Sequence, residues 1–270
     1  YNNVLYYLAA LSVMELAEDF EDKAHQIQAD KIKFKFNHLF WPERGHNYGD
    51  ILDHINYKDG NTRNFPHPCS IAAFNKAAEH RHFYLSHVCY GRFVDICDNL
   101  GNSIAIVANL ADEKKQAEII KYFLERHITQ PYPAKNLADP ITATNNQWAM
   151  LKKDVEQFQP EQWRNPPGCY HNAGVWPYIG GFYILALIKS GNKEFARVEL
   201  DRLAQANRLG IDRDWGFHEW IDSNTGRPNG AALQSWNASA YVMAYQAINN
   251  PSLVQKHSFP VLPQTERNVK

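Results

Sequence analysis

A single carboxylate, Glu219, stands among aromatic side chains in the stretch GFHEWIDSNTGRPNGAALQSWNAS, residues 216–239. A polar turn that contains Arg227 follows it. A carboxylate between aromatic rings is partly shielded from water, and shielded carboxylates serve as general acids or bases in catalysis. The alternative without function is an exposed Glu219 that forms an ion pair with Arg227 or Arg213.

A second stretch, CYHNAGVWPYIGGF at residues 169–182, combines hydrogen-bonding groups with a flat indole ring. Sugars require both, because polar side chains bind their hydroxyl groups and aromatic rings pack against their apolar faces. Without function, Asn172 would cap a helix and Trp176 would lie in the core. The two stretches give the candidate carbohydrate-binding residues, which are Tyr170, His171, Asn172, Trp176, Trp220, Arg227, Gln234 and Trp236.

Composition excludes several classes of partner. The 270 residues carry a net charge of −1, so nothing predicts binding to nucleic acid or to an acidic membrane surface. No stretch reaches the roughly 18 apolar residues that a membrane helix needs. The chain has four cysteines without metal-type spacing and no nucleotide or zinc motif, so we expect reduced thiols, a cytoplasmic location, no metal and no cofactor. The N-x-S triplet at Asn237 lies in an apolar run, and we interpret it as chance.

Apolar periodicity predicts helices almost throughout. Two segments, 102–110 and 175–190, are apolar on every face and must be buried on all sides, whereas 112–127 and 192–209 are amphipathic. Further helices are expected near residues 1–16, 29–40, 70–80, 146–156 and 231–249, with Asp112 and Asn192 as N-caps. The expected buried faces are Leu5, Leu8, Ala9, Ser12 and Leu16 in the first helix, Ala29, Ile32, Phe36, Leu39 and Phe40 in the second, and Ile120, Phe123, Leu124 and His127 in 112–127.

This alternation of inner and outer helices predicts stacked helical hairpins, either in a solenoid or in a closed double ring. Solenoid repeats have a fixed period and short loops. Here the loops before the inner helices are long and rich in Trp, Tyr, Pro and His, which favours the ring and a functional end. We therefore expect loops 41–50, 128–148, 169–176 and 215–230 to line one concave end.

These stretches, in this order, resemble bacterial amylo-α-1,6-glucosidase-like (glycogen debranching-type) proteins. The resemblance rests on YHNAGVWPYIGGFYILALIKSGNKEFA and on the pattern F-H-E-W, T-G-x-P-x-G, Q-S-W-N-A. Shorter matches are NVLYY at 3–7, DNLGN at 98–102 and YP at 132–133, so that about residues 1–250 are covered. Neutral/alkaline invertases are the nearest rival family, since they share Tyr-His-Asn and a Pro-Glu-aromatic version of the carboxylate loop.

Both families belong to the six-hairpin glycosidases, so the resemblance implies an all-α, (α/α)6 toroid fold. It implies an incomplete ring over residues 1–250 and a polar tail over 251–270. Such enzymes are usually inverting: an acid protonates the leaving oxygen, and a carboxylate activates water. Glu219 matches that general base. The matching general acid, with the first hairpins of the ring, is expected upstream of Tyr1, which leaves Asp50, Asp53, Asp95 and Asp98 as the candidates within this sequence.

The leading prediction is therefore an inverting hydrolase of an α-glucoside, of the α-1,6-glucosidase or debranching type. The alternatives are a neutral invertase-like sucrose hydrolase and a carbohydrate-binding remnant that lacks the general acid. A sugar epimerase would need paired histidines, and the twelve histidines here are scattered. A plain helical scaffold is disfavoured by the chemistry of the loops.

Overall fold

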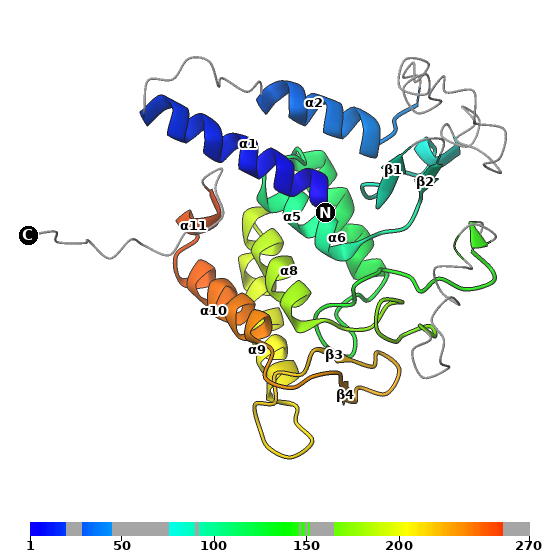
Figure 1. Cartoon of the computed structure of the whole chain (residues 1–270), viewed down its shortest axis with the longest axis vertical. Helices are drawn as coiled ribbons and strands as arrows, with labels where there is room; N and C mark the ends of the chain where they lie inside the picture. Colours follow the sequence, from blue (N-terminus) through cyan, green and yellow to red (C-terminus); the bar gives the residue numbers. More distant parts are fainter. Residues whose placement is uncertain are drawn as a thin grey trace, which may run out of the picture.

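The structure, a computed structural model, describes residues 1–19, 29–44, 76–89, 92–145, 147–148, 151 and 165–255. Helices dominate it, with two small two-stranded antiparallel sheets, which confirms the all-α class (Figure 1). The helices are α1 (Asn2–Asp19), α2 (Ala29–Phe40), α5 (Asn99–Val107), α6 (Glu113–Glu125), α8 (Pro177–Lys189), α9 (Lys193–Arg208), α10 (Ser235–Asn249) and α11 (Ser252–Gln255). The strands are β1 (His87–Cys89), β2 (Arg92–Val94), β3 (Trp220–Ile221) and β4 (Pro228–Asn229).

The described helices alternate between an inner and an outer position, as predicted. Every residue of α5 is buried, and α8 is buried on nearly all sides, whereas α6 and α9 each bury one face. α8 packs against α5, α9 and α10, so the inner helices lie side by side with α6 and α9 outside them (Figure 1). This arrangement forms part of a ring of helical hairpins.

Two adjacent glycines in α8 allow this close packing. A Cβ atom on Gly181 would lie 2.7 Å from Cβ of Ala240 on α10, and one on Gly180 would lie 2.6 Å from the carbonyl oxygen of Pro133. Helix backbones can approach this closely only where side chains are absent. α8 is therefore fixed between α10 and the segment before residue 135.

Backbone pairing joins the loops at one end of the inner helices. Isolated β-bridges pair Asp98 with Leu137, Lys135 with Val175, and Val175 with Ile221 of the β3–β4 hairpin. We call these pairings the rim ladder, and the segments 95–98, 132–139, 169–176 and 215–234 the rim. The ladder confirms that three of the four predicted loops share one end. The fourth, 41–50, is described only to residue 44.

The boundaries of α5 differ from the expected 102–110. α5 begins at Asn99 because the Asp98 side chain caps it, accepting a hydrogen bond from the Leu100 N–H (3.1 Å), and it ends early where Asn109 adopts a left-handed φ of 57°. Asp112 caps α6 as predicted. Asn192 occupies the N-cap of α9 as predicted, but its side chain makes no capping bond, because its amide donates to Ser190 instead.

Two of the predicted buried faces were wrong in part. α1 packs against both α2 and α5. It therefore buries Val4, Tyr7, Leu8 and Ala10, whereas Leu5, Ala9 and Ser12 are exposed. In α6, Ile119, Ile120 and Phe123 are buried and Leu124 is exposed, and His127 lies beyond the end of the helix with a left-handed φ of 49°. The α2 face is confirmed for Ala29, Phe36 and Phe40.

Three predicted segments lie partly or wholly outside the described residues. The helix expected at 70–80 is described only from residue 76, and the one at 146–156 only at residues 147–148 and 151. The side chain of Leu16, expected to be buried in the first helix, likewise lies outside the described part. The tail predicted from residue 251 begins with α11, whose Val254 is buried against the core. Residues 256–270 are not described, so the polar tail stays a prediction.

An ion pair on α9 holds the segment that leads into the rim. The Arg202 guanidinium bonds to Glu199 (3.0 Å), whose side chain is 1% exposed, and also donates to the carbonyl groups of Thr129 and Pro131. A second Glu–Arg pair with the same spacing, Glu194 and Arg197, lies exposed on the same helix. The first pair contains a buried carboxylate and bonds to the segment that leads into the rim, whereas the second pair is exposed.

We predict that Arg202→Leu lowers the free energy of unfolding by about 3–5 kcal/mol, because it leaves the Glu199 carboxylate buried and unpaired. Arg197→Leu is the matched control, and it should change stability by no more than about 0.5 kcal/mol because its pair is solvated. Urea denaturation of both variants measures the difference. Equal losses would show that the buried pair does not hold the fold.

Candidate active site

The Glu219 carboxylate is held by the opposite strand of its own hairpin. The Glu219 N–H donates to the carbonyl of Ala231 (2.8 Å), and Oε2 accepts from the Ala231 N–H (3.2 Å). Gly230 adopts φ +69°, and a Cβ there would lie 2.5 Å from Oε2 of Glu219. Only glycine fits this position without strain. The side chain is half-buried and fixed by backbone groups.

Three rings of the 169–176 loop stack beside this carboxylate. His171 lies parallel to Trp176, with ring centroids 5.1 Å apart and an interplanar angle of 2°, and Tyr170 lies 5.2 Å from Trp176. The indole N–H of Trp176 donates to the carbonyl of Tyr170 (2.9 Å). Trp176 is therefore the buried base of the stack, and His171 and Tyr170 present its outer surface.

The aromatic surface continues on both sides of the stack. Trp220 meets Tyr170 edge to face at 5.9 Å, and Tyr178 meets Trp176 at 6.1 Å and Trp236 at 6.4 Å. Trp236 is 46% exposed, at the start of α10. We call the set Tyr170, His171, Tyr178, Trp220 and Trp236 the aromatic surface. Its members lie in the rim or in the first turn of α8 and α10.

Glu219 lies next to this surface, because the residue that follows it, Trp220, contacts Tyr170. Burial lowers the pKa of His171, and the negative charge of Glu219 opposes that effect. Burial also raises the pKa of Tyr170, with a further rise from Glu219. At neutral pH, then, the His171 ring is neutral and the Tyr170 hydroxyl keeps its proton. Both can exchange hydrogen bonds with a neutral, hydroxyl-rich ligand.

The other three predicted binding residues, Asn172, Gln234 and Arg227, differ in how far they are exposed. Asn172 is 1% exposed, and its side-chain amide bonds to backbone groups of Ile141 and Asn165, which leaves no free donor for a sugar. Gln234 sits half-buried at the N-cap of α10, and Arg227 is exposed at the tip of the β3–β4 hairpin. Among the described ion pairs, none joins Glu219 to Arg213 or Arg227.

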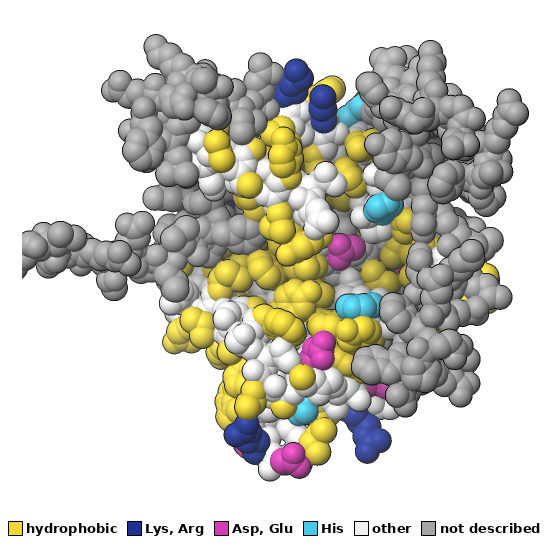
Figure 2. All heavy atoms as spheres, in the orientation of Figure 1, with side chains coloured by type: hydrophobic (Ala, Val, Ile, Leu, Met, Phe, Trp, Pro, Cys, Tyr) yellow, Lys and Arg dark blue, Asp and Glu magenta, His cyan; other side chains and the backbone are white. Residues whose placement is uncertain are grey.

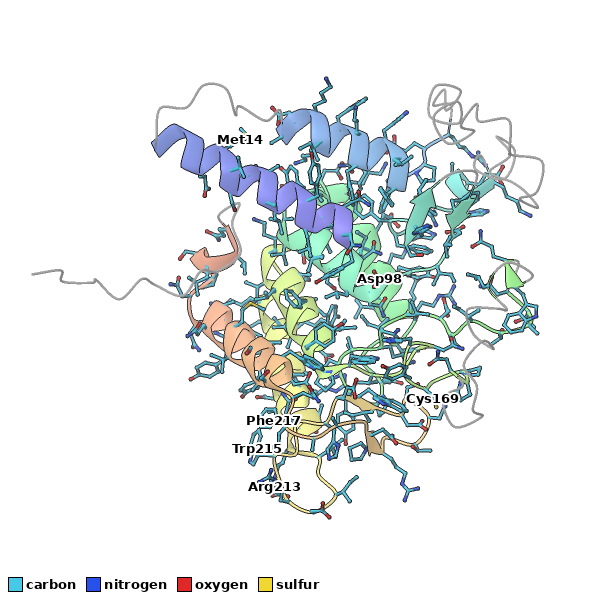
Figure 3. All side chains as sticks on the ribbon, in the orientation of Figure 1. Met14, Asp98, Cys169, Arg213, Trp215 and Phe217 are labelled. Carbon is cyan, nitrogen blue, oxygen red and sulfur yellow. The ribbon has the colours of Figure 1, made fainter. Side chains whose placement is uncertain are left out.

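Trp215 is not one of the groups that the structure shows fixing Glu219. Its ring is 46% exposed and stacks on Phe217 at 5.9 Å. In Figure 3 both lie near Arg213, away from the label of Asp98. Of the two tryptophans that flank the carboxylate in sequence, only Trp220 belongs to the aromatic surface.

Asn237 is a positioning residue that the local sequence does not reveal. Its side chain is fully buried in the first turn of α10. Oδ1 accepts from the Tyr178 N–H (3.0 Å), and Nδ2 donates to the carbonyl of His218 (2.7 Å). Asn237 thus joins the starts of α8 and α10 to the residue before Glu219. The asparagine of the N-x-S triplet is therefore a buried structural side chain.

Backbone strain is concentrated in the rim. Seven described non-glycine residues have left-handed φ values. Those in the rim are Tyr170, Ala173, Trp215, Phe217 and Leu233. Such conformations cost about 1–3 kcal/mol each and cluster at functional sites. The rim, and not the helical layer, therefore has the marks of a binding site.

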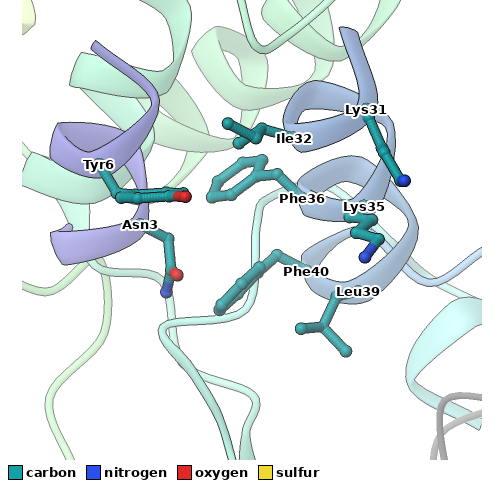
Figure 4. Close-up of a pocket in the computed structure, with 8 residues that line it drawn as sticks. All are labelled: Asn3, Tyr6, Lys31, Ile32, Lys35, Phe36, Leu39 and Phe40. Carbon is teal, nitrogen blue, oxygen red and sulfur yellow. The ribbon is translucent and has the colours of Figure 1, made fainter. Parts of the chain in front are cut away.

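A groove of about 480 Å³ lies between α1 and α2, lined by side chains such as Tyr6, Ile32 and Phe36 (Figure 4). It is mainly apolar and holds no acidic group among its lining residues.

Within the described part of the chain, no group of three or more His, Cys, Asp or Glu side chains is arranged to hold a metal ion, and no helix is long and apolar enough to cross a membrane.

Comparison with protein families gives a match over residues 89–251, which cover most of the described helices and the whole rim, to the family of alkaline and neutral invertases. The chain belongs to the alkaline and neutral invertase family. Invertases of this family are glycoside hydrolases. The family membership agrees with the six-hairpin glycosidase resemblance, and it favours the invertase side of that resemblance over the debranching side.

Plant invertases are among the chain's relatives. Probable alkaline/neutral invertase D of Arabidopsis thaliana is 29% identical over 184 residues, which are 63% of this chain and 30% of the plant protein. Cytosolic invertase 1 of Oryza sativa subsp. japonica is 29% identical over 175 residues, or 63% of this chain and 29% of that protein. The chain thus spans about 30% of the length of these relatives.

Solved structures show the same fold. A GH63 mannosylglycerate hydrolase from Thermus thermophilus, in complex with Tris and D-glycerate, aligns with a TM-score of 0.54 at 11% identity, over 91% of this chain and 44% of that one. The same hydrolase in complex with glucose aligns with a TM-score of 0.51 at 14% identity. The invertase-family chain therefore has the (α/α)6 toroid fold, as one part of the ring.

We predict that Asn237→Ala lowers the free energy of unfolding by about 1–3 kcal/mol, because it leaves the His218 carbonyl and the Tyr178 N–H without their partner. Asn249→Ala, at the other end of α10, removes only an exposed bond to Tyr245 and should change stability by less than about 0.5 kcal/mol. Thermal unfolding of both variants tests this. A similar loss in the two would contradict the positioning role.

Proposed function

We propose that this protein is a glycoside hydrolase of the invertase type, which cleaves sucrose with Glu219 as the general base. The observation that carries the proposal is the half-buried Glu219 carboxylate, held by Ala231 and Gly230 beside Tyr170 and His171, in a chain of the invertase family. A general base must be rigid and must lie next to bound substrate. Glu219 has both properties if the sugar lies on the aromatic surface.

In this proposal each group has one task. Glu219 takes a proton from a water molecule that attacks the anomeric carbon, which inverts its configuration. Trp236 and Trp220 offer ring faces and edges to the sugar. Tyr170, His171, Gln234 and Arg227 supply hydrogen bonds to its hydroxyl groups. Asn172 and Trp176, both buried, hold the loop that carries Tyr170 and His171.

Two of the four candidate proton donors, Asp95 and Asp98, lie among the described residues, but in this proposal the donor comes from another part of the ring. By resemblance, the general acid belongs to a loop upstream of the segment that matches residues 1–7, and the candidates Asp50 and Asp53 fall outside the described part of the chain. Further hairpins of the ring would cover apolar side chains that are exposed here on α1 and α10, such as Tyr6 and Tyr245. Burial raises the pKa of the free thiol of Cys169 to about 11, so thiolate chemistry is not part of the proposal.

One observation favours an α-1,6-glucosidase instead. The residue before Glu219 is His218, whereas the invertase version of this loop has proline. His218 is 5% exposed and precedes the carboxylate directly. The two activities are separated by comparing the hydrolysis of sucrose and isomaltose by the protein with its complete natural sequence. Binding of either sugar without hydrolysis would favour the carbohydrate-binding alternative.

Glu219→Gln should lower the kcat for sucrose by roughly 10²–10⁴-fold, because an amide keeps the shape of the side chain but cannot accept the proton. Sucrose affinity, measured by calorimetry, should change little. Glu194→Gln, on the exposed face of α9, is the control and should leave both quantities unchanged. Turnover that survives Glu219→Gln would remove Glu219 from the chemical step.

Trp236→Ala should weaken sucrose binding by about 1–3 kcal/mol, because it removes an exposed ring of the aromatic surface. Trp215→Ala is a matched control, since both rings are 46% exposed and only Trp236 contacts Tyr178. Calorimetric titration of both variants measures the effect. If the two variants bind sucrose equally well, Trp236 is not part of the binding surface.

A further inference from the structure

Asp222 begins the turn that connects β3 with β4, and both of its carboxylate oxygens are bonded. Oδ1 accepts from the backbone N–H groups of Asn224 (2.8 Å) and Thr225 (3.1 Å), which shapes the turn. Oδ2 accepts from the thiol of Cys169, with 3.6 Å between the sulfur and the oxygen. Aspartate side chains commonly form turns by bonding to N–H groups two or three residues ahead. Here the same side chain also joins the hairpin to the 169–176 loop.

Backbone bonds connect this loop to the residues on either side of Asp222. Ile221 and Val175 exchange two hydrogen bonds, of 2.8 and 2.9 Å, as a step of the rim ladder. The Ser223 N–H donates to the carbonyl of Gly168 (2.9 Å). Asp222 therefore lies where the segment from residue 168 to residue 175 closes against the hairpin.

The turn that Asp222 shapes also packs directly against the start of this segment. Nδ2 of Asn224 donates to the carbonyl of Pro167 (2.9 Å). Gly168 has φ +88°, and a Cβ atom there would overlap the side chain of Asn224. Only glycine permits both this backbone conformation and this approach. The turn and the segment are thus fitted to each other.

This contact relates the proposed general base to the rings that bind the sugar. Glu219 and Trp220 come shortly before Asp222 on the hairpin, whereas Tyr170 and His171 lie within the closed segment. Figure 2 shows acidic and histidine side chains around this hairpin, set among apolar ones. If the hairpin moved against the segment, the carboxylate would move relative to a sugar on the rings. A misplacement of about 1 Å can lower a rate about 100-fold, because the reacting groups lose their alignment.

We propose that Asp222 is a positioning residue, which holds the hairpin that carries Glu219 against the loop that carries Tyr170 and His171. This inference rests on the proposed function and names the residue that fixes the base relative to the substrate. In this role Asp222 touches neither the sugar nor the attacking water molecule. It acts through its acceptor oxygens, one of which shapes the turn while the other bonds to Cys169.

The test compares two substitutions of Asp222 in the protein with its complete natural sequence. Asp222→Ala removes both bonds and should lower the kcat for sucrose about 10- to 100-fold, because Glu219 loses its alignment. KM should change by less than about threefold, since the aromatic surface remains. Asparagine keeps an acceptor oxygen for the turn, so Asp222→Asn should restore kcat to within about threefold of the natural value.

Asp112→Ala is the matched control for Asp222→Ala. The Asp112 carboxylate likewise accepts from a backbone N–H a few residues ahead, that of Lys115 (2.9 Å), but it lies at the start of the outer helix α6, away from the rim. Its loss should lower thermal stability and leave kcat unchanged, because a helix cap stabilises the fold without touching the site. All kcat values are measured well below the unfolding temperature of each variant.

Asn224→Ala tests the contact with the loop separately from the turn, because its backbone N–H still bonds to Asp222. It removes the bond to Pro167 and should also lower kcat, by about 2- to 10-fold. Together with Asp222→Ala, the loss should be smaller than the product of the two single losses, since both changes loosen the same contact. Losses that multiply would show that the two residues act independently, which contradicts the inference.

The other outcomes separate this inference from the proposed function. An unchanged kcat in Asp222→Ala, in a protein that otherwise hydrolyses sucrose, leaves the proposed function standing and removes Asp222 from the positioning of Glu219. A raised KM at unchanged kcat would assign Asp222 to substrate binding instead. A kcat that Asp222→Asn fails to restore would show that the charge matters and not the turn. If the natural protein hydrolyses no sucrose, the proposed function itself is wrong, and this inference falls with it.

Discussion

The rim depends on backbone pairing between loops that are far apart in the sequence. The rim ladder runs from Asp98 through Leu137, Lys135 and Val175 to Ile221, and it joins the segments that precede the inner helices α5, α8 and α10. Buried backbone N–H and C=O groups must be hydrogen-bonded, so long loops over an apolar helical layer stay ordered only if they pair with one another. The ladder meets this requirement, and by doing so it sets the spacing of every side chain at that end of the ring.

The helical layer provides stable packing, whereas the rim contains locally unfavourable structure. The layer follows propensity and packing: apolar inner helices, amphipathic outer helices, and a Gly180–Gly181 pair that lets α8 approach its neighbours closely. The rim departs from both, with left-handed φ values, a fully buried Asn237 and half-buried carboxylates. Functional sites commonly contain such locally unfavourable features, and the rest of the fold offsets their cost in folding free energy. Arg202 connects the helical layer with the rim. It lies on the outer helix α9 and donates to the carbonyl groups of Thr129 and Pro131, in the segment that enters the rim.

Sequence patterns predicted the helical layer well and the rim only in outline. Apolar periodicity identified the inner and outer helices, because burial on all sides leaves a direct signature in composition. The local sequence does not show which aromatic ring is exposed. Trp176 is buried beneath His171, whereas Trp236 is exposed, although both lie at the start of inner helices. Asn237 could not be recognised, because its two partners, Tyr178 and His218, come from separate segments. The Asp98 cap was missed because α5 was expected to begin at its first continuous apolar run.

The position of Glu219 on a hairpin, and not on a helix, follows from these constraints. The β3–β4 hairpin crosses the end of the helical layer (Figure 1), and its Trp220 contacts Tyr170 of the aromatic surface. The hairpin gains rigidity from two sides: its tip is tied to the 169 loop through the Ser223 N–H and the carbonyl of Gly168, and its base is tied through Asn237. A carboxylate fixed in this way needs no movement of its neighbours to meet a ligand. Preorganisation of this kind is what general-base catalysis requires, since the base must already be in position when the water molecule attacks.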